Sequence, residues 1–160
     1  MMKLEEIDLF KIDYGAPSPV LINDGANLQI IFYSDESFEN GTFDFADQRV
    51  ITLKFDRVSY HSMGPPNDEA LNGHPYYELG LQSAGFYKLL NSELIERLNL
   101  MNRFHPYYQP NAIDNSQHYI ITFKEKVFEC VARGFEFNIQ QTPLNEVAGA
   151  ALKQLLKTDN

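Results

Sequence analysis

Short apolar segments with a period of two are the feature that most constrains the fold of this chain. The clearest segment is 49–55, in which isoleucine, leucine and phenylalanine alternate with threonine and lysine. A similar pattern occurs at 119–123, and further apolar runs occupy 28–33, 127–133 and 135–139. Successive side chains of a strand point to opposite faces, so each segment predicts a strand with a buried face. We expect about six strands, mostly in one antiparallel sheet, with the last three forming a meander.

Helices are expected in the middle and at the C-terminus. Apolar residues step by three and four through a predicted helix near 143–157. Ser92 is a suitable N-cap for a second helix near 92–103, with Met101 in its buried stripe. Pro75 is well placed to begin a short middle helix. Hairpins combined with helices predict a single α+β domain over 1–160, with the helices on one face of the sheet.

Composition limits the classes of protein to which the chain can belong. Its 160 residues suit one domain, and its net charge of −9 argues against nucleic acid as a ligand. No apolar run approaches the roughly 20 residues of a transmembrane helix, so no membrane partner is expected. The acidic start of the chain predicts no signal peptide. A single cysteine, Cys130, excludes an internal disulfide and favours a cytoplasmic location.

A doubled tetrapeptide is the most distinctive motif. His74-Pro75-Tyr76-Tyr77 recurs as His105-Pro106-Tyr107-Tyr108. Two interpretations stay open: the copies line one recognition surface, or they are separate devices at helix edges that look alike. The first interpretation predicts a ligand cleft lined by imidazoles and phenols. Its candidate residues are His74, Tyr76, Tyr77, His105, Tyr107 and Tyr108.

A second candidate surface is an acidic stretch that contains aromatic residues and no lysine or arginine. Such a run is usually a solvated loop, but aromatic anchors ringed by charge are also typical of binding surfaces. We expect this stretch to contact a basic protein partner. Its residues are Asp35, Glu36, Phe38, Glu39, Phe43, Asp44 and Asp47.

Reaction chemistry has little support in the sequence. No two histidines are closer than thirteen residues in sequence, so no metal or cofactor is predicted. A three-residue turn at 124–126 would make His118 a diagonal neighbour of Cys130, and a register shift by one would separate them. We expect Cys130 to be a core residue and Glu129 to occupy an edge or solvent-facing strand position. No catalytic residues are assigned, and no Gly-x-Ser-x-Gly motif is present.

Several segments between Gly73 and Ala132 together resemble a family of small uncharacterised bacterial proteins. The resemblance implies no activity and assigns no site residues. The chain is also similar in size and charge to immunity proteins of bacterial toxin systems. The segments that carry the family resemblance are 73–77, Gly80-Leu81, Asn91-Ser92, 105–107, 118–123 and 128–132.

Two functions are therefore expected, from different classes. The first is a non-catalytic cytoplasmic binding protein of bacterial type, for example an immunity-like inhibitor of a basic partner. The alternative is a small enzyme or ligand-binding protein with a cleft of histidine and tyrosine side chains, with or without a metal. Whether the protein is an enzyme stays open, with binding favoured, and so does its oligomeric state.

Overall fold

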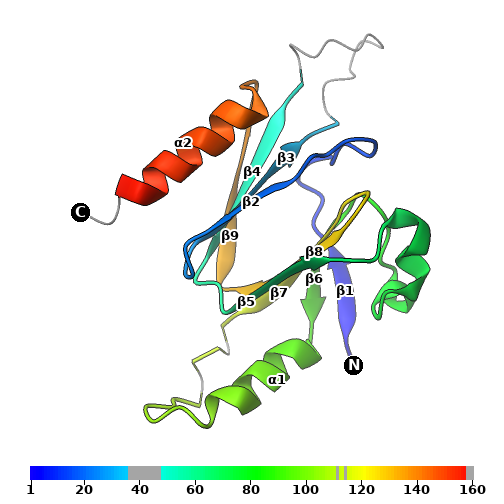
Figure 1. The fold of residues 1–160 in the computed structure, drawn as a ribbon. Helices are drawn as coiled ribbons and strands as arrows, with labels where there is room; N and C mark the ends of the chain where they lie inside the picture. The colour runs from blue at the N-terminus through cyan, green and yellow to red at the C-terminus, as the bar shows by residue number, and fades with distance from the viewer. Residues whose placement is uncertain (36–47, 111, 114, 158–160) are drawn as a thin grey trace.

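Two antiparallel sheets packed face to face form the centre of the molecule, with a helix on each outer side (Figure 1). This computed structural model describes residues 1–35, 48–110, 112–113 and 115–157. The α+β fold predicted from the sequence is confirmed. The described residues form nine strands rather than about six, and they are divided between two sheets.

The first sheet carries the candidate site. In spatial order it contains β1 (Lys3–Glu6), β6 (Phe86–Leu90), β7 (Gln117–Thr122), β8 (Val127–Ala132) and β5 (Tyr60–Gly64).

The second sheet has four strands. In spatial order these are β2 (Val20–Asn23), β3 (Leu28–Tyr33), β4 (Val50–Asp56) and β9 (Gly134–Gln140). The predicted three-strand meander is therefore wrong at its last strand, because β9 pairs with β4 and not with β8. Phe135 and Ile139 of β9 pack against the core between the sheets, which holds this strand in the second sheet.

The chain also changes sheet after β4. After Arg57 the apolar positions of the sequence change phase to Val58 and Tyr60, a pattern that predicts a bulge. The backbone of Arg57 takes a positive φ of 50°. The next strand, β5, pairs with β8 of the first sheet. The change of phase therefore marks a crossing between sheets.

The core lies between the inner faces of the two sheets and is rich in aromatic rings. Phe86, Tyr119 and Phe128 come from the first sheet, and Phe32 and Phe55 come from the second. Tyr119 contacts Phe55 at a ring-centroid distance of 5.4 Å and Phe86 at 6.0 Å, so rings from the two sheets meet in this core. Alternate residues of β7 and β8 face this core, so the residues between them must face outward.

Helix α2 (Leu144–Lys157) covers the outer face of the second sheet through Val147 and Ala151. Helix α1 (Glu93–Asn102) lies on the outer side of the first sheet, where Leu94 is buried. Its C-terminal half extends beyond this contact (Figure 1). Met101, predicted to be buried, is therefore 64% exposed.

Two 3-10 helices take the place of the predicted short middle helix. They are η3 (Asp68–Gly73) and η4 (Tyr77–Leu79), and they cover another part of the outer face of the first sheet through Leu71 and Leu79. None of the helices in the described ranges has the length and apolar character needed to cross a membrane.

The packing around β6 yields a test of the fold. A Cβ atom at Gly85 would overlap the phenol of Tyr87, a buried residue whose hydroxyl bonds to Gln82. Gly85→Ala should therefore destabilise the protein by about 1–3 kcal/mol. Gly149 lies inside α2 with open space around it, so Gly149→Ala should stabilise by up to about 1 kcal/mol. Urea unfolding measures both, and equal effects would contradict this packing.

Candidate functional site

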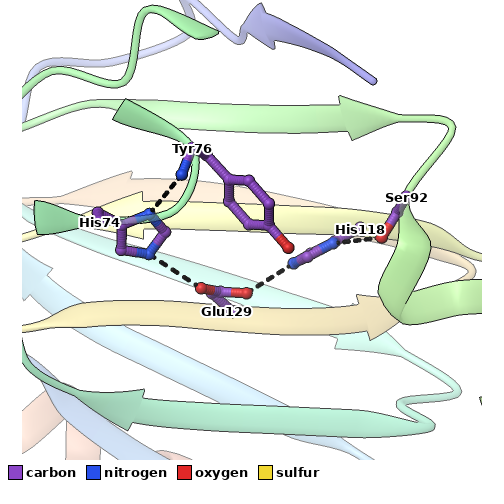
Figure 2. A network of polar contacts seen from close by, with 5 residues as sticks. All are labelled: His74, Tyr76, Ser92, His118 and Glu129. Atoms are coloured by element: carbon purple, nitrogen blue, oxygen red, sulfur yellow. Dashed lines mark hydrogen bonds and ion pairs between the residues drawn. The ribbon is translucent and has the colours of Figure 1, made fainter. Parts of the chain in front are cut away.

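Glu129 of β8 lies on the outer face of the first sheet, where two imidazoles bind its carboxylate (Figure 2). Oε1 is 3.1 Å from Nε2 of His74, and Oε2 is 2.8 Å from Nε2 of His118. The Glu129 side chain is only 18% exposed. Ser92 bonds to the far side of the His118 ring. We call Ser92, His118, Glu129 and His74 the polar network.

The register of the β7–β8 hairpin brings this network together. His118 pairs with Val131, so Glu129 is its diagonal neighbour on the same face. The predicted three-residue turn is wrong by one residue. Phe123 donates its N–H to the carbonyl of Lys126 at 2.8 Å, which leaves two residues in the turn. Glu129, which we expected at an edge or solvent-facing strand position, is therefore mostly buried on the histidine side.

The same register places Cys130 on the opposite face from His118. Cys130 is fully buried in the core between the sheets, which confirms its predicted place. Burial, and to a smaller extent the charge of Glu129, raises the pKa of the thiol well above its usual value. The thiol is consequently held in its neutral form and is separated from the polar network by the sheet.

The protonation of His74 follows from its turn. Its Nδ1 accepts the backbone N–H of Tyr76 at 3.2 Å, so that nitrogen carries a lone pair. Its carbonyl accepts the N–H of Tyr77 at 3.0 Å and closes the turn. The proton of the neutral ring must therefore be on Nε2, which donates it to Glu129. The first tetrapeptide thus aims one N–H at a carboxylate of β8.

His118 is fully buried and has a partner at each ring nitrogen. Its Nε2 faces the carboxylate, which can only accept while it is ionised. Its Nδ1 is 2.7 Å from Oγ of Ser92. In the neutral ring, Nε2 donates to Glu129 and the hydroxyl of Ser92 donates to Nδ1. All the polar atoms of this buried group are then paired.

Ser92 links the network to α1. It is the N-cap residue of this helix, as predicted, but its hydroxyl makes no capping bond to a helix N–H. An N-cap serine usually accepts a bond from the second or third helical N–H. Here the hydroxyl is directed to His118, so the network joins α1 to β7, β8 and the turn at 74–77.

Electrostatics favour an ionised Glu129. Burial alone would raise its pKa, but hydrogen bonds from His118 and His74, together with attraction to these imidazoles when charged, lower the pKa to about 2. Tyr76 packs its ring edge-on to His118 at 5.8 Å and lies between the two imidazoles (Figure 2). Burial, followed by the charge of Glu129, raises the pKa of the Tyr76 phenol. This phenol therefore stays neutral and helps to cover the carboxylate.

The second tetrapeptide forms the same turn in a different setting. Nδ1 of His105 accepts the N–H of Tyr107 at 3.1 Å, and the His105 carbonyl accepts the N–H of Tyr108 at 3.0 Å. Both His105 and Tyr107 are exposed. No hydrogen bond or ring contact in the described part of the chain joins this turn to the first one. The two copies are thus local turns with equal geometry and different surroundings.

The predicted cleft residues are accordingly divided. His74 and Tyr76 lie in or against the polar network, whereas Tyr77 is 41% exposed and Tyr108 is partly buried in the second turn. Ser92, His118 and Glu129 were not among the predicted site residues. The sequence did single out Glu129, as an acidic residue between apolar neighbours in a predicted strand. The face of the sheet on which its side chain lies depended on the register of that strand. The predicted binding stretch, apart from Asp35, lies outside the described residues.

In the described ranges, no group of three or more His, Cys, Asp or Glu side chains is arranged to hold a metal ion. The remaining histidine, His61, bonds through Nε2 to the side chain of Asn23 at 2.7 Å. Both Nε2 atoms of the network face one carboxylate as hydrogen-bond donors, which leaves no shared site for a cation between them.

Exposed apolar residues cluster at the end of α1 and in the turn after it. Phe104 is 92% exposed and Tyr107 is 86% exposed, next to Met101 and the half-exposed Leu100. Together these four residues are called the α1 patch. They lie within eight positions of the sequence, on a segment that extends away from the sheets (Figure 1). Such a concentration of large apolar side chains is typical of a contact surface.

Comparison of the chain with protein-family models, with curated proteins and with solved structures finds no match.

The two turns provide a matched test of the polar network. His74→Ala removes one of the two N–H donors to the Glu129 carboxylate, so we expect a loss of about 2 kcal/mol or more in the free energy of unfolding. His105→Ala removes only the local bond of an exposed turn and should cost less than about 1 kcal/mol. Urea unfolding at pH 7 compares them. Equal losses would show that the bond to Glu129 stabilises nothing.

Acidic pH should lower the free energy of unfolding of the protein through the protonation of Glu129. Its pKa is about 2 when folded against 4.5 when unfolded, so its contribution is complete above pH 4.5 and is lost as the pH falls toward 2. Between pH 5 and pH 3, we expect this group to remove about 2 kcal/mol of stability. Glu129→Gln should lack this part of the pH dependence. Parallel stability curves for the two proteins over this range would contradict the assignment.

Proposed function

We propose that this protein works by binding another protein through the α1 patch. The observation that carries the proposal is the exposure of four large apolar side chains, Phe104 and Tyr107 above all, in one short segment. Phe104 and Tyr107 are far more exposed than the other aromatic side chains of the described residues, of which the next, Tyr14, is 57% exposed. Large apolar side chains concentrated in this way are typical of a contact surface. Aromatic side chains and methionine are also the residues most enriched in protein interfaces.

The second tetrapeptide supports this role by fixing the backbone that presents the patch. The His105 imidazole bonds the N–H of Tyr107, and the His105 carbonyl bonds the N–H of Tyr108. The His105 and Tyr107 rings lie 6.1 Å apart. A turn held by its own hydrogen bonds loses less conformational entropy on binding than a free loop. The patch is therefore prepared before a partner arrives.

Charge favours a basic partner. The chain has 22 acidic residues against 13 lysines and arginines, which gives the net charge of −9. Opposite charge speeds the encounter of two proteins, and the effect weakens as salt screens it. The specific form of the proposal is an inhibitor of a basic protein, such as an immunity protein. The similarity in size and charge to proteins of that kind supports this form.

The apolar α1 patch should hold the bound partner, and the acidic charge should speed its association. Two double variants test these effects separately. Phe104→Ser with Tyr107→Ser should raise the dissociation constant at least about tenfold, mainly through faster dissociation. Asp44→Lys with Asp47→Lys should slow association at low salt and leave dissociation nearly unchanged. The partner is first captured from the native cell with wild-type protein, and binding kinetics are then measured at two salt concentrations.

Leu152→Ser is the matched control, because Leu152 is an exposed apolar residue of α2 on the second sheet. It should bind the partner like the wild type. Undiminished binding by the Phe104 and Tyr107 double variant would remove the α1 patch from the account. Loss of self-association in the variant, with no other protein captured, would instead identify the occupant as a second copy of the chain.

A further inference from the structure

A groove of about 440 Å³ runs along the start of α1, and Ser92 lies in its wall. Leu89, Leu90 and Ile95 contribute apolar surface to this groove, and Glu96 contributes a negative charge. Ser92 is 7% exposed, so its contact with the groove is narrow. A groove of this size accommodates a small molecule. An apolar wall beside a negative charge favours ligands that carry no negative charge of their own.

The hydrogen bonds from Ser92 to His118 and from His118 to Glu129 run in the direction expected for an activated nucleophile. Its hydroxyl donates to Nδ1 of His118 at 2.7 Å, and Nε2 of the same ring donates to Glu129 at 2.8 Å. The carboxylate thus holds the ring with its lone pair aimed at the hydroxyl. Serine hydrolases use this order of hydroxyl, imidazole and carboxylate, which is recognised by geometry and not by sequence position. Here the ring nitrogens are exchanged, with Nδ1 facing the serine.

The position of Ser92 adds a second element of such a site. It stands on the two-residue connection from β6 to α1, after Asn91, whose backbone has a positive φ of 54°. The first N–H groups of a helix have no acceptor within the helix. The Ser92 side chain caps none of them. The N–H groups of Glu93 and Leu94 follow Ser92 directly in the chain, and they are the donors that an oxyanion formed at this serine would require.

We propose that Ser92 is a nucleophile for small uncharged carboxylic esters, with His118 as its base. Glu129 and His74 are positioning residues, which orient and support the imidazole. This activity goes beyond the binding of a partner protein and does not depend on it. The groove supplies the surface for the ester, and the network supplies the proton acceptor.

The reaction balances with the residues present. Oγ of Ser92 bonds to the carbonyl carbon of the ester as its proton moves to Nδ1 of His118. The carbonyl oxygen becomes an oxyanion at the N–H groups of α1. The C–O bond to the alcohol then breaks, and the leaving oxygen takes the proton from Nδ1. Water repeats the sequence on the acyl-serine, releases the carboxylic acid and restores the hydroxyl.

The full-length wild-type protein is treated with a fluorophosphonate probe and, separately, with p-nitrophenyl acetate. We expect one organophosphonyl group per chain from the probe, and from the ester an acetyl group trapped by acid quenching, both located on Ser92 by peptide mass spectrometry. Ser116, which lines the same groove and is equally buried, should carry none. Localisation in the wild type does not depend on whether any variant folds. An unmodified Ser92 after prolonged exposure to both reagents would overturn the proposal.

Three variants separate chemistry from folding. Ser92→Ala should abolish labelling, while Ser83→Ala, at a serine outside the network whose hydroxyl is buried, should react like the wild type. Glu129→Gln should lower the maximal acylation rate by about 100-fold or more. The ester concentration at half-maximal rate should stay the same, because the groove is unchanged. Equal acylation by Ser92→Ala, or a change only in the half-maximal concentration with Glu129→Gln, would contradict the assignment.

Discussion

The pairing of one mostly buried carboxylate organises the outer face of the first sheet. A charge taken out of water is costly unless hydrogen bonds replace its hydration. Glu129 obtains these bonds from His74 in the first tetrapeptide and from His118 in the neighbouring strand. Ser92 continues the chain of bonds to the first turn of α1. Three parts of the chain that are distant in sequence, namely the turn at 74–77, the start of α1 and the β7–β8 hairpin, thereby meet at one group. The surfaces beside this group depend on that meeting.

The doubled tetrapeptide shows how one local structure can have two roles. In each copy the histidine ring bonds the backbone N–H two residues later, so the turn is encoded locally. In the first copy the remaining ring nitrogen meets Glu129, and the turn is held against the sheet. In the second copy the turn follows α1 past its contact with the sheet, and Tyr107 is left in solvent. Surroundings, and not sequence, distinguish the two copies.

Local pattern predicted the strands near 28–33, 49–55, 119–123, 127–133 and 135–139, the two longer helices and the N-cap position of Ser92, because periodicity and capping depend on neighbouring residues. It did not predict β2 or β6. It failed where distant segments compete. Whether β9 would pair with β8 or with β4 depended on the core between the sheets, and whether Met101 would be buried depended on where the sheet ends. A shift of one residue in the β7–β8 turn decided that Glu129, and not Cys130, shares a face with His118. That single register could not be read from the sequence.

Binding at the α1 patch and chemistry at Ser92 both require the hydrogen bonds of the polar network, which hold α1 and the turn at 74–77 to the first sheet. Those bonds require specific proton positions on two rings. Nitrogen-15 NMR of the histidine side chains at pH 8 tests this requirement most directly. The account predicts that both His74 and His118 carry a proton on Nε2 and a lone pair on Nδ1. A proton on Nδ1 of either ring, or signals that average between tautomers as in a free imidazole, would contradict it.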